Sequence, residues 1–337
     1  MVNKLKSLIP DLVYNYIRDR YRYRRLKKSY LYDLNHYFKY SMREVSILEK
    51  KIISIIILDT HVMEKGLTMP ETRLGFGKAR LNVLINNILN YFEDYNNTNT
   101  QVLHGVSVIE EYFLLHKVKN FILDDSIKEK YNKLKDLVSK KEIKIKSRRQ
   151  IDMSKEDYFA KSDASFFEFS ETRSSIRNWT AEKVDLNLVL QALDLCRNTP
   201  SACNRQSVRV HLYTDKTEID NILEIQGGNR GFGHLSSFLI VVTFEPSVFF
   251  EENERNSGFV DGGMYCMNIL YALHANKIAA CILNTAHSPK KDVNIRKCTN
   301  IPSSEIFVGM IAGGIPPTNF MIAKSFRYPL GDILLKH

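Results

Sequence analysis

Two short stretches, Arg173-Ser174-Ser175-Ile176-Arg177 and Pro200-Ser201-Ala202-Cys203-Asn204-Arg205-Gln206, say more about the fold than any other part of this 337-residue chain. The first places two guanidinium groups and two hydroxyl groups within five residues. Arginine binds phosphate oxygens bidentately and hydroxyl groups can donate to the oxygens that remain. The second carries side-chain amides, which can donate to and accept from the edge of a flat heterocycle. With the amphipathic helix expected over 183–197 between them, they predict a site for a phosphorylated planar cofactor.

Each stretch alone also has a plainer explanation. Two arginines four residues apart, such as Arg173 and Arg177, suit the exposed start of an ordinary helix. The Pro-Ser-Ala-x-Asn pattern suits a helix end followed by a polar loop. The joint occurrence of both stretches, together with Arg327 near the C-terminus, favours the cofactor site.

The two stretches, with the expected helix between them, resemble the N-terminal signature of the FMN-dependent nitroreductases. That signature reads Arg-x-Ser-x-Arg followed, at about the same distance along the chain, by Pro-Ser-x-x-Asn-x-Gln. The resemblance covers residues 165–337, where Val260-Asp261-Gly262-Gly263 opens an apolar helix and Arg327-Tyr328-Pro329-Leu330 is similar to a C-terminal phosphate-contact segment. Within it, helical stretches (183–197 and 261–276) alternate with β-branched or aromatic runs over 208–213, 238–244 and 306–311, which predict an α+β sandwich around a central sheet. The resemblance implies the same α+β fold, a nitroreductase-like α/β sandwich with a central mixed sheet. It also implies a homodimer with flavin sites at the subunit interface.

The same resemblance implies roles for individual residues. The first stretch would contact the FMN phosphate and ribityl chain, the second would lie beside the isoalloxazine or ribityl chain, and a loop at 283–285 would approach flavin N5. Two positions depart from the family pattern, because Lys277 stands where a glycine is expected and His274 where a small residue is common. They raise the alternative of a silent homologue that has lost its flavin. The predicted cofactor-binding residues are Arg173, Ser174, Ser175, Arg177, Pro200, Ser201, Asn204, Gln206, Asn284, Ser325 and Arg327.

The implied activity needs no dedicated acid, base, nucleophile or metal ion. Flavin N5 accepts a hydride from a reduced nicotinamide nucleotide, NADH or NADPH, and passes electrons to a small organic substrate. The resemblance therefore predicts an FMN-dependent oxidoreductase, while the identity of the substrate depends on the shape of the pocket. The glycine-rich loop at 227–234 is a second candidate for approaching substrate, although such loops are more often plain connections.

Length and charge divide the chain in two. A single core seldom grows beyond roughly 250 to 300 residues, so 337 residues favour two units. Residues 1–150 hold 29 Lys and Arg against 17 Asp and Glu, whereas residues 151–337 hold 19 against 21, so the net charge of +10 comes from the first part. We place the boundary near residue 150, between a basic all-α extension (1–150) and the nitroreductase-like, FMN-binding domain (151–337).

The extension reads as helices. Leu, Ile, Tyr and Phe recur at three- and four-residue spacing over 8–58, 78–95 and 105–122, and the charged stretch 128–149 suits an exposed helix that runs into a linker. Arginines and lysines alternate with tyrosines over 18–28, a pattern that can bind nucleic acid, anionic lipid or an acidic protein, or simply form a solvated helix face. No strong nucleic-acid signature is present. The alternative function is a binding or sensing protein that docks through this basic unit and has little or no catalytic activity.

One cluster in the extension, residues 61–78, is rich in polar side chains and turn formers. On a helix, His61, Glu64 and Lys65 share one face. Gly66 can cap that helix and Pro70 prevents its continuation, which leaves a loop with Arg73 projecting. Either this loop covers the flavin pocket and His61 or Arg73 meets an anionic or hydroxylated group of the substrate, or it only packs the extension onto the catalytic domain. A zinc site is not expected, because His-Glu-x-x-His is absent.

The five cysteines are an odd number without Cys-x-x-Cys spacing, which indicates a reducing, cytoplasmic setting. Charges interrupt the apolar residues near the N-terminus, and the apolar run 52–58 is too short to span a bilayer. We therefore expect neither a signal peptide nor a transmembrane helix.

Overall fold

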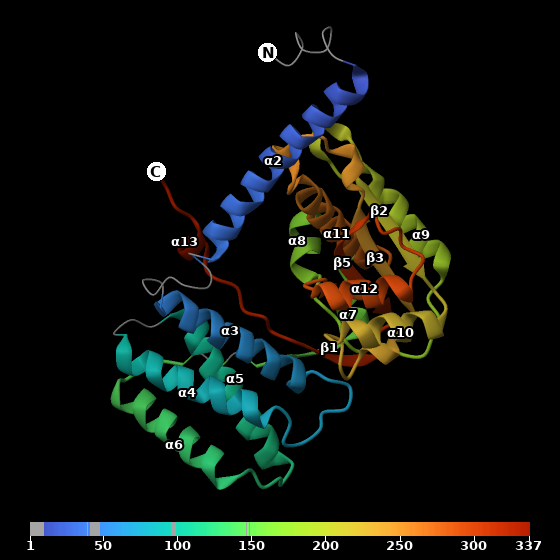
Figure 1. Cartoon of the computed structure of the whole chain (residues 1–337). Helices are drawn as coiled ribbons and strands as arrows, with labels where there is room; N and C mark the ends of the chain where they lie inside the picture. Colours follow the sequence, from blue (N-terminus) through green and yellow to red (C-terminus); the bar gives the residue numbers. More distant parts are fainter. Residues whose placement is uncertain (1–9, 39, 41–47, 96–98, 146, 148) are drawn as a thin grey trace.

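The computed structural model describes residues 10–337 apart from 39, 41–47, 96–98, 146 and 148. Its N-terminal part contains a long helix, α2 (Asp11–Tyr37), followed by α3 (Leu48–Leu67), α4 (Lys78–Asp94), α5 (Thr100–Val118) and α6 (Asp125–Lys140). Helices α3 to α6, the helical unit, pack around one apolar core (Figure 1). The predicted helical character of the N-terminal part is confirmed for the described residues. Residues 8, 9, 39 and 41–47 of the predicted stretch 8–58, and 146 and 148 of the stretch 128–149, lie outside them.

Helix α2 is separate from this core. It lies against the short turn η6 (Glu252–Glu254) of the C-terminal part, and Arg255 donates to both carboxylate oxygens of Asp33 at 2.6 and 2.7 Å. A second ion pair joins Arg25 to Glu252. Most other side chains of α2 are exposed to solvent.

A four-stranded sheet forms the centre of the C-terminal part. Its strands β2 (Val208–Tyr213), β3 (Phe238–Phe244), β5 (Ile306–Gly314) and β4 (Ala279–Asn284) lie in that order, and each pair is antiparallel. The predicted α+β fold and the strands over 208–213, 238–244 and 306–311 are confirmed. The sheet was expected to be mixed, whereas every pairing among its described strands is antiparallel.

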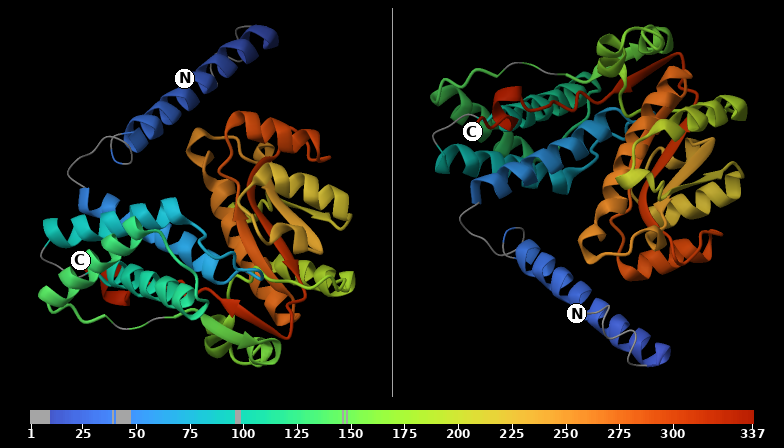
Figure 2. Two further views of the ribbon diagram at one scale, coloured as in Figure 1. Left: turned by 90° about the horizontal axis from the view of Figure 1, so that it is seen from below. Right: turned by 90° about the horizontal axis from the view of Figure 1, so that it is seen from above.

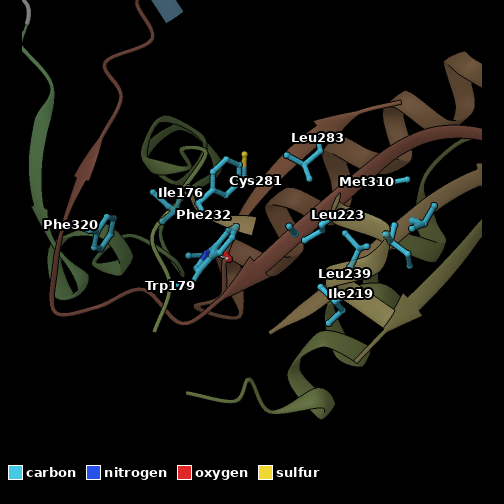
Figure 3. Close-up of a cluster of buried hydrophobic side chains, with 14 of the residues drawn as sticks. Ile176, Trp179, Ile219, Leu223, Phe232, Leu239, Cys281, Leu283, Met310 and Phe320 are labelled. Carbon is cyan, nitrogen blue, oxygen red and sulfur yellow. Dashed lines mark hydrogen bonds between the residues drawn. The ribbon is translucent and has the colours of Figure 1, made fainter. Parts of the chain in front are cut away.

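Both faces of this sheet are covered, because every residue of β3 is buried. Successive side chains of a strand point to opposite faces. Thus Leu239 and Val241 pack with α10 (Lys216–Gln226) and α12 (Pro289–Lys297), while Ile240 and Val242 pack with α9 (Leu186–Leu195) and α11 (Ser257–Ala275). Figure 2 shows these helices on the two sides of the sheet, and Figure 3 shows the first cluster around Leu239. The result is a three-layered sandwich.

The two ends of the C-terminal part meet next to the helical unit. Strand β1 (Ile151–Ser154) pairs antiparallel with β6 (Asn319–Ile322), and the chain continues from β6 to the short helix α13 (Leu330–Ile333). Between β6 and α13 it follows the helical unit (Figures 1 and 2), where Gln101 Nε2 on α5 donates to the Phe326 carbonyl at 3.3 Å. The remaining helices, α7 (Lys155–Phe159) and α8 (Phe166–Thr172), connect β1 to the first predicted site stretch.

Some local expectations need correction. Gly66 does not cap α3, because the helix continues to Leu67; a Cβ at Gly66 would lie 2.0 Å from the Phe76 ring, so the glycine makes room for that side chain. The expected loop at 283–285 begins inside strand β4, which runs to Asn284. No helix of the described residues is long and apolar enough to cross a membrane.

Candidate functional site

A pocket of about 680 Å³ lies between the helical unit and the C-terminal part. Its walls come from α3, α5, the end of α8 and the stretch that follows it, β4, and the segment that follows β6. It is therefore built from regions far apart in the sequence. The lining residues are Ile57, Thr60, His61, Glu64, Gln101, His104, Ser170, Glu171, Arg173, Ser174, Ser175, Arg177, Ile282, Ala323, Lys324, Ser325, Phe326 and Arg327.

Hydrogen bonds to residues outside the pocket hold the backbone of the stretch 173–177 in place. Ile176 is buried in the core, and its N–H donates to the Ala280 carbonyl of β4 at 3.1 Å. The buried Tyr158 hydroxyl donates to the Ser174 carbonyl at 3.0 Å. These bonds fix the backbone, so Arg173, Ser175 and Arg177 present half-buried side chains to the pocket.

The pocket gathers positive charge. Arg173, Arg177, Lys324 and Arg327 all line it, and none of them lies within ion-pair distance of a carboxylate among the residues that the structure describes. Within the same described ranges, the Nε of Arg173 is buried without a hydrogen-bond partner. A buried donor without a partner costs free energy. This donor set fits an anion with several acceptor oxygens, such as a phosphate group.

Lys65, at the end of α3, adds to this charge. Its Nζ is 3.4 Å from the Gly228 carbonyl and 5.9 Å from the centre of the Phe232 ring. Burial and the nearby positive charge of Arg177 lower its pKa. The glycine-rich loop 227–234 thus lies against α3.

The helical unit contributes a carboxylate that is already used within the protein. Glu64 accepts from His104 Nε2 at 2.9 Å and from the Ser325 N–H at 2.9 Å, and its Oε2 is 3.6 Å from His61 Nδ1. Burial alone would raise the pKa of Glu64, but the hydrogen bonds from the two histidines outweigh it and hold this pKa at about 2. Glu64 is therefore ionised at neutral pH.

His274 and Lys277 end helix α11 near this site. His274 is buried, its Nε2 lies 2.9 Å from the Thr172 hydroxyl, and burial and the charge of Arg173 lower its pKa to about 4. Lys277 takes the left-handed conformation (φ +58°) that a glycine would adopt without cost. The departure from the family pattern at Lys277 leaves the backbone turn intact.

Seven of the predicted site residues meet in this pocket, and six do not line it. The exposed or half-buried stretch 200–206 packs against the start of α11, where the Ala202 N–H donates to the buried Asp261 carboxylate at 3.0 Å. Arg73 is exposed in the loop after α3. The pocket brings together Arg173, Ser174, Ser175, Arg177, Ser325, Arg327 and His61, and it leaves out Pro200, Ser201, Asn204, Gln206, Asn284 and Arg73.

Sequence reasoning missed several residues of the pocket. Lys324 directly precedes the predicted Ser325, so the neighbouring positive charge was a usable signal. His104 and Gln101 come from α5, forty residues or so beyond α3, and only the packing of the two helices brings them to the site. No local pattern marks them.

Comparison with known proteins is consistent with the resemblance. The sequence model of the Nitroreductase family matches residues 171–229. This range includes both stretches that carry the signature, so the predicted resemblance is confirmed there. No curated protein matches.

Similar solved structures cover about half of this chain. One is a putative NADH dehydrogenase/NAD(P)H nitroreductase from Parabacteroides distasonis (19% identity, 51% of this chain, 97% of that chain, TM-score 0.45). Another is a putative nitroreductase in complex with FMN from Desulfovibrio desulfuricans (23% identity, 51% and 95%, TM-score 0.41). A third is an FMN-dependent nitroreductase from Clostridium difficile (17% identity, 50% and 94%, TM-score 0.42).

Proposed function

We propose that the protein is an FMN-dependent oxidoreductase of the nitroreductase type, which transfers electrons from NADH or NADPH to a small organic substrate. One observation carries the proposal. The two arginines and two serines of 173–177 meet Ser325 and Arg327 in a single pocket, where the described residues offer these arginines no carboxylate partner. Such a set suits a phosphate monoester, which carries nearly two negative charges at neutral pH.

In this proposal the protein's task is to hold and orient the cofactor. Bound FMN supplies a ring that accepts and donates a hydride. Arg173 and Arg177 bind phosphate oxygens, and Ser174, Ser175 and Ser325 donate to the oxygens that remain. The buried Ile176 keeps the two arginines at a fixed separation, because its N–H is bonded to β4.

We further propose a homodimer in which a second copy completes the site. The stretch 200–206, with Asn204 and Gln206, lies outside the pocket of its own chain and is accessible. Helix α11, on which this stretch packs, exposes apolar side chains, among them Phe259 and Val260 with exposed fractions of 47% and 60%. Burial of that apolar face in a subunit interface would be favourable.

The five cysteines are all free, which suits the reducing, cytoplasmic setting expected from the sequence.

The absorbance spectrum of the purified protein from 300 to 550 nm tests the proposal, recorded before and after anaerobic addition of NADH or NADPH. We expect flavin bands that bleach on addition of one of the two. The double variant R173Q/R177Q should purify without flavin, while R20Q, which changes an exposed arginine of α2, should keep it. A wild-type protein that is colourless and does not take up added FMN would refute the proposal.

A second candidate function rests on α2. Its arginines and lysines at positions 20, 22, 24, 25, 27 and 28 are exposed, and so are the tyrosines between them. Such a surface suits docking on an anionic partner, which would make the basic helix a targeting or sensing element. Binding of this kind should weaken steeply between 50 and 200 mM salt, whereas reduction of the flavin should not. A partner whose binding is indifferent to salt would exclude this reading of α2.

A further inference from the structure

A histidine of the helical unit faces the pocket next to the arginines. His61 on α3 lines the pocket, and its side chain is 43% exposed. Its Nδ1 lies 3.6 Å from Glu64 Oε2, and its Nε2 has no partner among the described residues. One ring nitrogen is thus directed to the protein, and the other is available to a ligand.

Glu64 is the centre of a buried group that holds this histidine. Its other oxygen accepts from His104 Nε2 and from the backbone N–H of Ser325, both at 2.9 Å. Glu64 and His104 are buried, with exposed fractions of 2% and 3%. The group therefore ties α3, α5 and the C-terminal segment together at the point where Arg327 and Lys324 enter the pocket.

The identity of the ligand group follows from the charges. Four arginine and lysine side chains line the same pocket without carboxylate partners in the described part of the chain, and the charge of Glu64 is taken up by two histidines and a backbone N–H. Glu171 is the other carboxylate that lines the pocket, so positive side chains still outnumber carboxylates by four to two. An anion with several oxygens satisfies such an excess best.

We propose that the doubly protonated ring of His61, with Nδ1–H directed to Glu64, donates from Nε2–H to the phosphate group of the ligand, so that the helical unit forms part of the cofactor site. Glu64 acts as a positioning residue, because it fixes the ring through Nδ1 and does not touch the ligand. This inference rests on the proposed function for the identity of the ligand as FMN. The phosphate contact itself is independent of redox chemistry.

Two substitutions separate the roles of the two ring nitrogens. In H61N the side-chain amide can replace Nδ1 and keep the contact to Glu64, but nothing reaches the position of Nε2. In H61Q the amide nitrogen can replace Nε2. Because His61 is half-exposed, both variants should fold. H337N is the matched control, since His337 is exposed and lies outside this pocket.

The assay compares the dissociation constants of FMN and riboflavin, which differ only in the phosphate. A hydrogen bond between charged groups contributes on the order of 1.5 to 3 kcal/mol, or about tenfold or more in affinity. We expect H61N to weaken FMN binding by about tenfold and riboflavin binding by less than twofold, with H61Q between H61N and the wild type. E64Q should weaken FMN binding selectively as well, and H337N should change neither constant.

The outcome distinguishes this inference from the proposed function. If H61N binds FMN as the wild type does, or loses FMN and riboflavin by the same factor, His61 does not contact the phosphate and the inference fails while the flavin proposal stands. If the wild type binds neither flavin, inorganic phosphate replaces them as the probe. Phosphate binding that H61N weakens would then support the inference without the flavin, and a wild type that binds no phosphate would overturn both.

Discussion

His274 should make the protein less stable as the pH falls below neutrality. The side chain is buried among the rings of Tyr158, Phe159 and Phe169. Burial, and secondly the positive charge of Arg173, lower its pKa from 6.5 to about 4. At neutral pH the ring is therefore uncharged in the folded protein, and protonation would place a charge in an apolar surrounding next to an arginine.

The sign and size of the effect follow from linkage. Below pH 6.5 the unfolded chain binds a proton at this position, whereas the folded protein does not until the pH reaches about 4. Acidification therefore favours the unfolded state across this window. Each pKa unit corresponds to 1.36 kcal/mol, so the contribution of His274 to the free energy of unfolding should fall by about 2 kcal/mol between pH 7 and pH 5.

Urea unfolding of the wild type and of H274F at pH 7, 6 and 5 isolates this contribution. The phenylalanine keeps the aromatic contacts and cannot titrate, while groups such as Glu64 contribute equally to both proteins. The free energy of unfolding of the wild type should fall by about 2 kcal/mol more than that of H274F. Parallel pH profiles for the two proteins would show that His274 is not held neutral, and the argument from its surroundings would be wrong.

Of three further predictions, two concern backbone positions in the C-terminal part and one concerns the packing of α2. K277G should raise the free energy of unfolding by about 1 kcal/mol, because Lys277 adopts the left-handed conformation at the end of α11. Urea unfolding measures this gain, and an unchanged midpoint would mean that Lys277 is not strained. G313A should lower the free energy of unfolding by about 1–3 kcal/mol, since its Cβ would lie 2.4 Å from the Phe238 ring. G331A is the control: the new Cβ has open space around it, so the free energy of unfolding should change by less than about 0.5 kcal/mol. R255A removes the two-pronged ion pair to α2 and should speed hydrogen exchange of the α2 amides while changing global stability by less than about 1 kcal/mol; unchanged exchange would mean that other contacts hold the helix.

The parts of the fold that were predictable are those whose cause is local. The strand over 238–244 is a run of apolar and β-branched residues, and the structure buries every one of them. The stretch 173–177 was recognisable because phosphate chemistry requires arginines and hydroxyls close together in the sequence. In both cases neighbouring residues carry the whole signal.

What the sequence did not reveal depends on contacts between distant residues. Glu64 was placed on a helix face with His61, but its main partner is His104 on another helix, and its third partner is the backbone of Ser325, 261 residues away. Strand β4 was not predicted, and its last two residues fell within the loop expected at 283–285; its pairing with β5 extends it to Asn284. Six predicted site residues lie outside the pocket, because neither a family signature nor a local pattern states which residues of one chain share a pocket. In the proposed homodimer, the stretch 200–206 of a second copy would complete the site.

The pocket lies at the interface between the helical unit and the C-terminal part, so its charges affect both ligand binding and the contact between the two parts. Burial and, secondly, the positive charge of Arg177 lower the pKa of Lys65, so like charges from the two parts lie near each other at this interface. Glu64 offsets some of that repulsion from the helical side, because it binds the C-terminal segment through the Ser325 N–H. A bound phosphate would offset much more, since its two negative charges would lie among Arg173, Arg177 and Arg327. Binding a ligand that the unfolded state does not bind stabilises the folded state, so added phosphate should raise the urea midpoint of the wild type and should raise that of R173Q/R177Q less.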